Sequence, residues 1–314
     1  MSSISDSQSP DRSGHYPGPP RVILAATDFS EPSDAALVSA ATIGEAAGAE
    51  VHAMHCLKRP GPFGWWDEEG ETARLADAEA MLHEQIDRAC GGGWKAATVV
   101  VTSGRPATEI NGRASAVGAD LIVVGPGRRR FRSATRLGST ADRVIRTSRV
   151  PCLLAHAPLE AAPRVVLLAT DFSPSARHAR DVIVAWLTGG LSQTDRGDDP
   201  PRLVVLCVNA YADRPTPPRS PGRLLEAEVA RIGERIGPGQ VAVEPVLYSA
   251  SLVVDGVQKV AEKESADLVV VGTHGYNPLS RMLVGSVATA IAGSLDRPLL
   301  VVPPEPQPED GGST

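Results

Sequence analysis

A ten-residue stretch occurs twice in this 314-residue chain, and this repeat constrains the fold more than any other sequence feature. Residues 21–30 are RVILAATDFS and residues 164–173 are RVVLLATDFS, so eight of ten positions are identical at an offset of 143. A second pair of matching stretches, around Gly125 and Gly272, recurs at an offset of 147. Each unit is long enough to form its own core, unlike the short units of a solenoid. We therefore expect two homologous domains.

The composition between and beyond the repeats suggests the domain boundaries. Residues 1–20 are rich in Ser, Pro and Gly and have no apolar periodicity, which is typical of a disordered tail. A short linker with two prolines separates the repeats. We expect a first domain over residues 21–157 and a second over residues 163–303. Residues 304–314 are expected to form a disordered C-terminal tail.

Apolar runs of strand length alternate with helical spacing in both halves. This alternation predicts an α/β fold, in which a parallel sheet is covered by helices on both faces. We expect two Rossmann-like domains, each with a five-stranded parallel sheet in the order 3-2-1-4-5. Ligands of such sheets bind beyond the carboxyl ends of the strands, where the winding reverses between the first and fourth strands. The expected strands are 21–28, 51–57, 97–102, 120–124 and 150–155, then 164–171, 202–208, 241–247, 268–271 and 297–303.

The reversal point of the second half carries an anion-binding pattern. The apolar run 268–271 is followed by Gly272 and Gly275, and after nine further residues Gly285 and Ser286 open a helix. Glycines let backbone N–H groups approach a phosphate, and the free N–H groups of a helix N-terminus favour its negative charge. Asp171 ends the first strand of the same half, so two separate features converge on one place.

The spacing Gly-x2-Gly-x9-Gly-Ser on a duplicated α/β pattern resembles the universal stress protein family. The resemblance covers residues 20–157 and 163–303, and it implies Rossmann-like domains that pair with one another. Some members of that family bind ATP, so the resemblance implies an ATP site formed mainly by the second domain. The hydroxyl of Ser286 would either bond a phosphate oxygen or cap its helix. The residues implied for this site are Thr170, Asp171, Val208, Val271, Gly272, Gly275, Gly285, Ser286 and Val287.

The first half departs from the family pattern at its middle glycine, where Arg128 stands. That side chain would either block the backbone approach to phosphate or supply a guanidinium group to bind it. The neighbouring arginines likewise either grip phosphate or form a solvated loop. Asp28 and Asp171 would contact a ribose or cap the following helices, and their recurrence in Thr-Asp-Phe-Ser favours the functional role. The weaker site implied for this half comprises Asp28, Gly125, Arg128, Gly138, Ser139 and Thr140.

Composition limits the classes of protein to which the chain belongs. A net charge of −6 argues against a general nucleic-acid binder, which needs a basic surface. No apolar run approaches the roughly 20 residues of a membrane-spanning helix, and the N-terminus has no secretory signal pattern. The four cysteines form no Cys-x-x-Cys pair, which favours reduced thiols and a cytoplasmic location. Cys56 and Cys207 are expected at equivalent strand positions.

Motifs of catalysis are missing from the sequence. There is no Walker A lysine, no Gly-x-Ser-x-Gly elbow and no His-Glu-x-x-His pair, and His52 and His55 are expected on opposite sides of a strand. We therefore expect neither catalytic residues nor a metal site. The sequence favours an ATP-binding stress-response protein that acts through its conformation or an unknown protein partner. The alternatives are a nucleotide-free structural adaptor and a slow ATPase or phosphotransferase that uses Asp171 and Mg²⁺. Pairing of the two domains is expected, and a further homodimer is left open.

Overall fold

The computed structural model describes residues 18–59, 68–91, 94, 97–127, 137–191, 199–210, 220–273 and 285–305. The described part of each half contains five strands and four helices in the same order. The first half comprises β1 (Val22–Thr27), α1 (Glu31–Ala47), β2 (Glu50–Lys58), α2 (Glu68–Cys90), β3 (Thr98–Gly104), α3 (Pro106–Val117), β4 (Leu121–Val124), α4 (Ser139–Thr147) and β5 (Cys152–Leu154). The second half comprises β6 (Val165–Ala169), α5 (Pro174–Thr188), β7 (Arg202–Asn209), α6 (Pro221–Arg235), β8 (Ala242–Ser249), α7 (Val253–Lys263), β9 (Leu268–Gly272), α8 (Ser286–Ser294) and β10 (Leu299–Val302).

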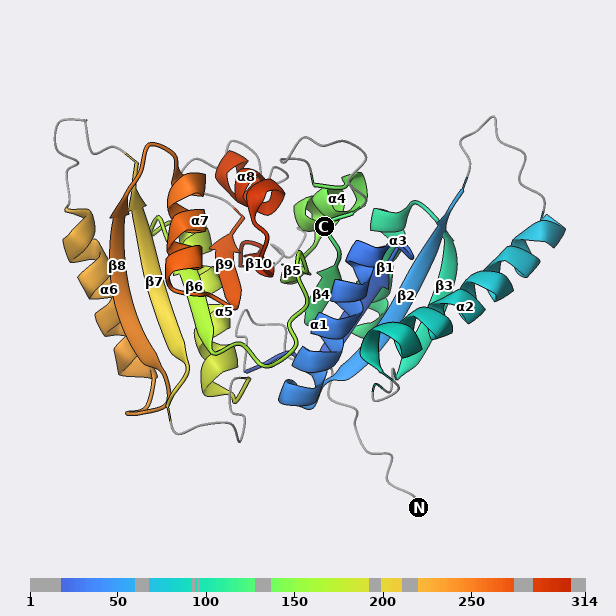
Figure 1. Cartoon of the computed structure of the whole chain (residues 1–314), viewed down its shortest axis with the longest axis horizontal. Helices are drawn as coiled ribbons and strands as arrows, with labels where there is room; N and C mark the ends of the chain where they lie inside the picture. The colour runs from blue at the N-terminus through green and yellow to red at the C-terminus, as the bar shows by residue number, and fades with distance from the viewer. Residues whose placement is uncertain are drawn as a thin grey trace, which may run out of the picture.

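All ten strands belong to one sheet, in the order β3-β2-β1-β4-β5-β10-β9-β6-β7-β8. Each half therefore has the order 3-2-1-4-5 expected from the sequence. Strands within a half are parallel, whereas β5 and β10 pair antiparallel, with Leu153 opposite Leu300. Figure 1 shows the two halves side by side with this strand pair between them. The two domains of the chain thus pair with each other through their fifth strands.

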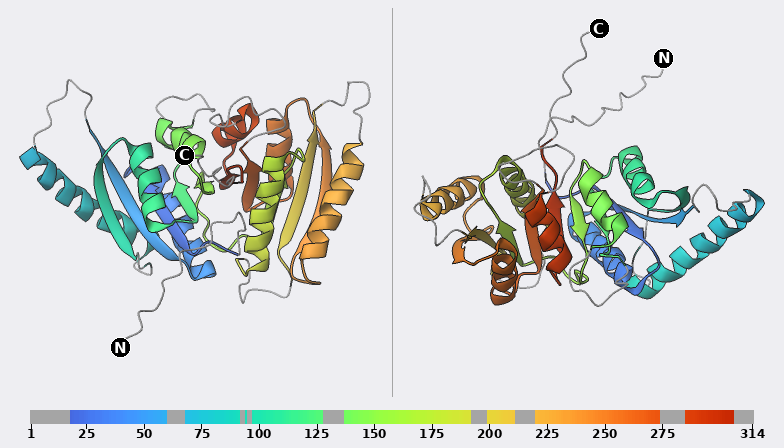
Figure 2. Two further views of the ribbon diagram at one scale, coloured as in Figure 1. Left: turned by 180° about the vertical axis from the view of Figure 1, so that it is seen from behind. Right: turned by 90° about the horizontal axis from the view of Figure 1, so that it is seen from above.

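Helices cover both faces of the sheet, and the core is split into two apolar layers. Alternate strand residues supply the two layers, so Ile23 and Ala25 belong to one and Leu24 and Ala26 to the other. Helices α1, α2, α5 and α6 pack on the first face and α3, α4, α7 and α8 on the second. The views in Figure 2 show the helices on either side of the twisted sheet. Burial on both faces explains why the central strands are continuous apolar runs.

Local sequence sets the helix boundaries. Helices α1 and α3 carry a proline in their first turn, where its fixed φ and missing N–H group are tolerated. Each ends at a glycine in the left-handed conformation, Gly48 with φ 64° and Gly118 with φ 65°. In the second half Ser265 takes the place of Gly118 with φ 51°. The repeat therefore preserves this helix stop even where the glycine is lost.

The segment that precedes each domain contacts the first helix of the other domain. Before β6, the backbone N–H of Leu159 donates to Oγ of Ser39 on α1, at 2.9 Å. Before β1, Pro19 lies against Gly189 at the end of α5, where an added Cβ would come within 2.3 Å of its Cδ. These two contacts supplement the β5–β10 pair in joining the halves.

The prediction that Cys56 and Cys207 are equivalent is wrong by one residue. In β2, Cys56 lies two residues after Met54, which pairs with Ala26 of β1. The repeat equivalent of Ala26 is Ala169 of β6, which pairs with Leu206 of β7. Cys207 lies one residue after Leu206. A shift of one residue moves a side chain to the other face of a sheet. The two thiols therefore point to opposite faces, although both are buried.

Two further expectations concern membrane-spanning helices and the two tails of the chain. The helices of the described ranges include none that is both long and apolar enough to cross a membrane. Residues 1–17 and 306–314, in which the tails were expected, lie outside the described residues.

Candidate functional site

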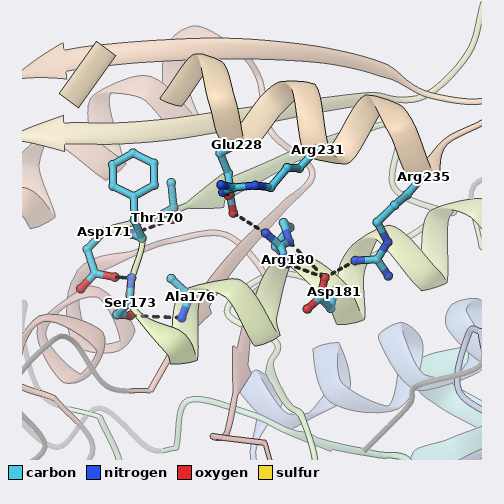
Figure 3. A network of polar contacts seen from close by, with 10 residues as sticks. Thr170, Asp171, Ser173, Ala176, Arg180, Asp181, Glu228, Arg231 and Arg235 are labelled. Carbon is cyan, nitrogen blue, oxygen red and sulfur yellow. Dashed lines mark hydrogen bonds and ion pairs between the residues drawn. The ribbon is translucent and has the colours of Figure 1, made fainter. Parts of the chain in front are cut away.

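A tight turn follows the first strand of the second half and presents Asp171 to solvent. Oδ1 of Asp171 accepts the backbone N–H of Ser173 at 2.9 Å, and the buried Oγ1 of Thr170 accepts that of Phe172 at 3.0 Å. Phe172 has a φ of 63°, which few residues other than glycine adopt. Helix α5 is capped by Ser173, whose Oγ accepts the N–H of Ala176 at 3.2 Å (Figure 3).

The same turn recurs in the first half. Oδ1 of Asp28 accepts the N–H of Ser30 at 3.1 Å, and Oγ1 of Thr27 accepts the N–H of Phe29 at 3.1 Å. Phe29 also has a positive φ, of 60°. Ser30 and Ser173 hold the N-cap positions, so the alternative in which the two aspartates cap the helices is wrong. Both aspartates are exposed.

The glycines that end the fourth strand of each half allow close packing on a helix. A Cβ on Gly272 would lie 2.7 Å from the backbone carbonyl group of Ser175 in the first turn of α5. A Cβ on Gly125 would lie 3.1 Å from the carbonyl oxygen of Pro32 in α1. Close packing therefore requires a glycine at position 272, whereas a side chain at position 125 would need its neighbours to shift by a few tenths of an ångström. The predicted contact of the two glycines with a ligand stays a prediction.

Two helix N-termini lie close beyond these strand ends. Gly285 precedes α8 and donates its N–H to the carbonyl oxygen of Thr273 at 2.6 Å. Gly138 precedes α4 and donates its N–H to the carbonyl oxygen of Pro126 at 2.8 Å. Among the described residues no side chain caps either helix, so the alternative in which Ser286 is a cap is wrong. Within the described residues the first N–H groups of both helices therefore have no side-chain acceptor, and such groups favour an anion.

The remaining predicted residues of the second half are divided between surface and core. Ser286 and Val287 are exposed in the first turn of α8, whereas Val271 is buried at the end of β9. Val208 is half-buried at the end of β7 and packs against Gly256 of α7, where an added Cβ would lie 2.7 Å from Cγ1 of Val208. Strand β6 lies between β7 and β9, so it brings Asp171 and the strand ends together. Gly275 lies outside the described residues.

The first half closes its loop differently. Gly127 has a φ of 87°, and a Cβ on it would lie 2.9 Å from Cα of Gly138. This glycine, one position before the family's middle glycine, therefore allows the chain to contact the start of α4. Ser139 is exposed and Thr140 half-buried in the first turn of that helix. Arg128 and the neighbouring arginines up to residue 136 lie outside the described residues.

Comparison with known proteins agrees with this geometry. The model of the universal stress protein family matches the chain twice, over residues 20–156 and 163–303. The chain belongs to the universal stress protein family. A universal stress protein of Mycobacterium tuberculosis is 26% identical over 271 residues, which is 83% of this chain and 86% of that protein.

A solved structure of the family has the same fold. A universal stress protein from Archaeoglobus fulgidus covers 92% of this chain and 98% of its own chain, with 20% identity and a TM-score of 0.66. A universal stress protein in complex with cAMP covers 44% of this chain and 98% of its own, with 26% identity and a TM-score of 0.35. The family is one of stress-response proteins, which agrees with the sequence expectation at that level.

The sequence analysis of this universal stress protein did not place two buried polar residues beside the turn that follows β1. The ring of His55 stacks on that of Phe29, with centroids 3.9 Å apart and an interplanar angle of 23°. Its Nδ1 lies 2.9 Å from the carbonyl oxygen of Thr27, and burial lowers the pKa of His55. Gln85 of α2 accepts the hydroxyl of Thr27 at 2.8 Å and donates to Oδ1 of Asp34. Only the register of β2 against β1 could have revealed the place of His55.

The thiol of Cys207, near Asp171 of the second turn, is not an active nucleophile. Burial, with a smaller effect of the Asp171 charge, raises the pKa of Cys207 to about 11, so its thiol is neutral at physiological pH. Within the described ranges no group of three His, Cys, Asp or Glu residues could hold a metal ion. What the described site offers is backbone N–H groups and one exposed carboxylate.

Proposed function

We propose that this universal stress protein binds ATP, mainly in its second domain, and acts through its conformation or a protein partner. The observation that carries the proposal is the uncapped N-terminus of α8 after Gly285, beyond the same sheet edge as Asp171. A helix start with free N–H groups favours a phosphate, and an exposed carboxylate can accept the hydroxyl groups of a ribose. Both features lie where ligands of doubly wound sheets bind.

The preference for the second domain rests on the loop before the fourth helix. In the first domain Gly127 lies directly against Gly138, and Arg128 replaces the glycine of the family pattern. In the second domain the pattern Gly272, Gly275 and Gly285 is complete in the sequence.

Binding rather than turnover is proposed because the sequence contains no catalytic motif and the described site supplies a single exposed carboxylate. Asp171 is the one ionisable group that the sequence analysis assigned there, and its Oδ1 accepts a backbone N–H group in the turn. A bound nucleotide would then regulate the protein only if two conformations or assembly states bind it with different affinity.

The test is a calorimetric titration with ATP. It uses the natural protein and two matched variants. Ser286→Asp and Ser139→Asp each place a carboxylate in the first turn of a helix, where it stabilises the helix but repels phosphate. We expect one ATP per chain, lost in Ser286→Asp and retained in Ser139→Asp. Equal binding by all three proteins would overturn the assignment of the site.

A second arm separates a binding protein from a slow ATPase. Phosphate release is measured with excess ATP and Mg²⁺, for the natural protein and for Asp171→Asn. We expect no release above the uncatalysed background from either protein. Turnover that disappears in Asp171→Asn would favour the ATPase instead.

A further inference from the structure

The first half contains a cavity of about 720 Å³, half open to solvent, that the nucleotide proposal does not use. It lies between α1, the end of α2 and the linker that precedes β6. Its walls include Val51 near the start of β2, so it opens at the amino ends of the strands, the edge opposite to Asp28. The volume is within the range of about 300–1,000 Å³ that small-molecule sites occupy.

The repeat provides an internal comparison for this cavity. Without gaps, residues 82–90 of α2 align with residues 225–233 of α6, since Leu82 matches Leu225 and Arg88 matches Arg231 at an offset of 143. Helices α1 and α5 follow the identical Thr-Asp-Phe-Ser stretches at the same offset. Each position that lines the cavity on these helices therefore has a known counterpart in the second half.

Two of those counterparts differ from the cavity residues in size or charge. Ala89 in the cavity wall corresponds to Ile232, which is fully buried in the core of the second half. Val38 corresponds to Asp181, which forms an ion pair with Arg235 of α6 (Figure 3). The fold thus accepts an isoleucine and a charged side chain at these two positions, where the first half carries Ala89 and Val38.

The wall combines apolar side chains with two carboxylates. Val38, Ala89, Trp94 and Pro158 supply apolar surface. The exposed side chains of Glu45 and Glu160 also line the cavity, one from α1 and one from the linker, and neither forms an ion pair with a described residue. The two carboxylates attract a cation, and the indole of Trp94 adds aromatic surface for an apolar group. The charge of this cavity therefore complements a cation and disfavours an anion such as a nucleotide.

We propose that this cavity binds a small amphipathic cation, with an apolar body against Trp94 and a protonated amine near Glu45 and Glu160. Because Glu160 and Pro158 belong to the linker and Glu45 belongs to α1, the bound amine connects the linker to the first domain. The ligand therefore acts on the segment that joins the two domains, away from the nucleotide site.

The experiment uses phenylbutylamine as the charged probe and phenylbutanol as its neutral counterpart, with the full chain and calorimetry. We expect the amine to bind once per chain and the alcohol to bind at least about fivefold more weakly, because it lacks the two charge contacts. The double variant Glu45→Gln, Glu160→Gln should bind the amine more weakly by a similar factor. Glu234→Gln, an exposed change of the same kind on α6, is the matched control and should leave binding unchanged.

A second variant tests the cavity itself. Ala89→Ile introduces the residue that the second half uses at the equivalent position, so it should fill the space and abolish binding of the amine. Its thermal unfolding, compared with that of the natural protein, reports whether it is folded. Equal affinity for amine and alcohol, full binding by a folded Ala89→Ile protein, or binding of a lysine-rich peptide but not the amine would each overturn the proposal.

Discussion

Arg146 of α4 donates a hydrogen bond from Nη2 to Oγ1 of Thr289 on α8, at 3.4 Å, and this bond joins the two repeats. The same guanidinium donates from Nε to both carboxylate oxygens of Asp142, at 3.0 and 2.9 Å. Asp142 and Thr289 are equivalent positions of the repeat at the offset of 147. One arginine therefore binds a residue and its repeat counterpart, on the two helices that lie next to each other in Figures 1 and 2.

The contact between Arg146 and Thr289 should contribute measurably to the pairing of the domains. Arg146→Ala should lower the free energy of unfolding by about 1 kcal/mol, as expected for a partly exposed ion pair with a hydrogen bond. A double-mutant cycle with Thr289→Val, measured by urea unfolding, should show a coupling energy of about 0.5 kcal/mol. Strictly additive effects would contradict a direct bond between the two side chains.

Gly272 should be intolerant of alanine even without a ligand. The added methyl group would meet the backbone of Ser175 at 2.7 Å, so Gly272→Ala should cost about 1–3 kcal/mol of stability. Gly233, exposed within α6, has no atom within 4 Å of the added Cβ, and Gly233→Ala should stabilise by roughly 0.5–1 kcal/mol. Thermal unfolding of both variants checks this pair. Similar changes in both would show that packing is not the reason for Gly272.

The free energy of unfolding should depend on the ion pair between the buried Glu228 of α6 and Arg180 of α5, whose Oε1 and Nη1 atoms lie 2.9 Å apart (Figure 3). Removal of the charge in Arg180→Met leaves a carboxylate that is 3% exposed with Arg231 as its remaining ion-pair partner among the described residues. The cost should approach about 3 kcal/mol, the lower end of the range for breaking a buried pair. Arg235→Met, at an exposed end of the same group, should cost less than about 1 kcal/mol. Urea unfolding that ranks the two variants in the opposite order would contradict this account.

The sequence predicted the strands and their order because both depend on local patterns. Apolar runs on a duplicated frame leave few ways to order parallel strands, and β1 and β6 begin and end within two residues of expectation. The pairing of β5 with β10 could not be predicted in this way. Both strands are short apolar runs that would also fit between two separate chains.

The candidate site was predicted less completely, since its details depend on contacts between distant segments. Gly272 was predicted as a ligand-binding glycine, whereas its close neighbour is Ser175, almost a hundred residues earlier in the chain. The position of Cys207 was misjudged because loop lengths around β7 differ between the halves, so a constant offset fails there. His55 was considered only as a metal ligand, and its stacking on Phe29 follows from the register of two strands.

The stability of the folded chain should depend on pH through His55. Burial lowers its pKa in the folded state, so the unfolded chain, with a pKa of about 6.5, takes up the proton first as pH falls. Stability is therefore fully present above about pH 6.5 and is lost as the pH falls below it. His55→Gln should remove part of this loss, and His178, whose pKa is also lowered by burial, should account for another part. Unfolding free energies measured across this range check the slope, and an unchanged slope in His55→Gln would contradict the assignment.

The central claim is that the second domain holds a nucleotide at the start of α8. The most direct measurement is to purify the full chain and its Ser286→Asp and Ser139→Asp variants, denature each, and identify and count the released nucleotide by chromatography. After incubation with ATP and removal of free nucleotide, the account predicts about one ATP per chain in the natural protein and in Ser139→Asp, and none in Ser286→Asp. Absence of nucleotide from all three proteins would contradict the account and favour an adaptor that binds no nucleotide.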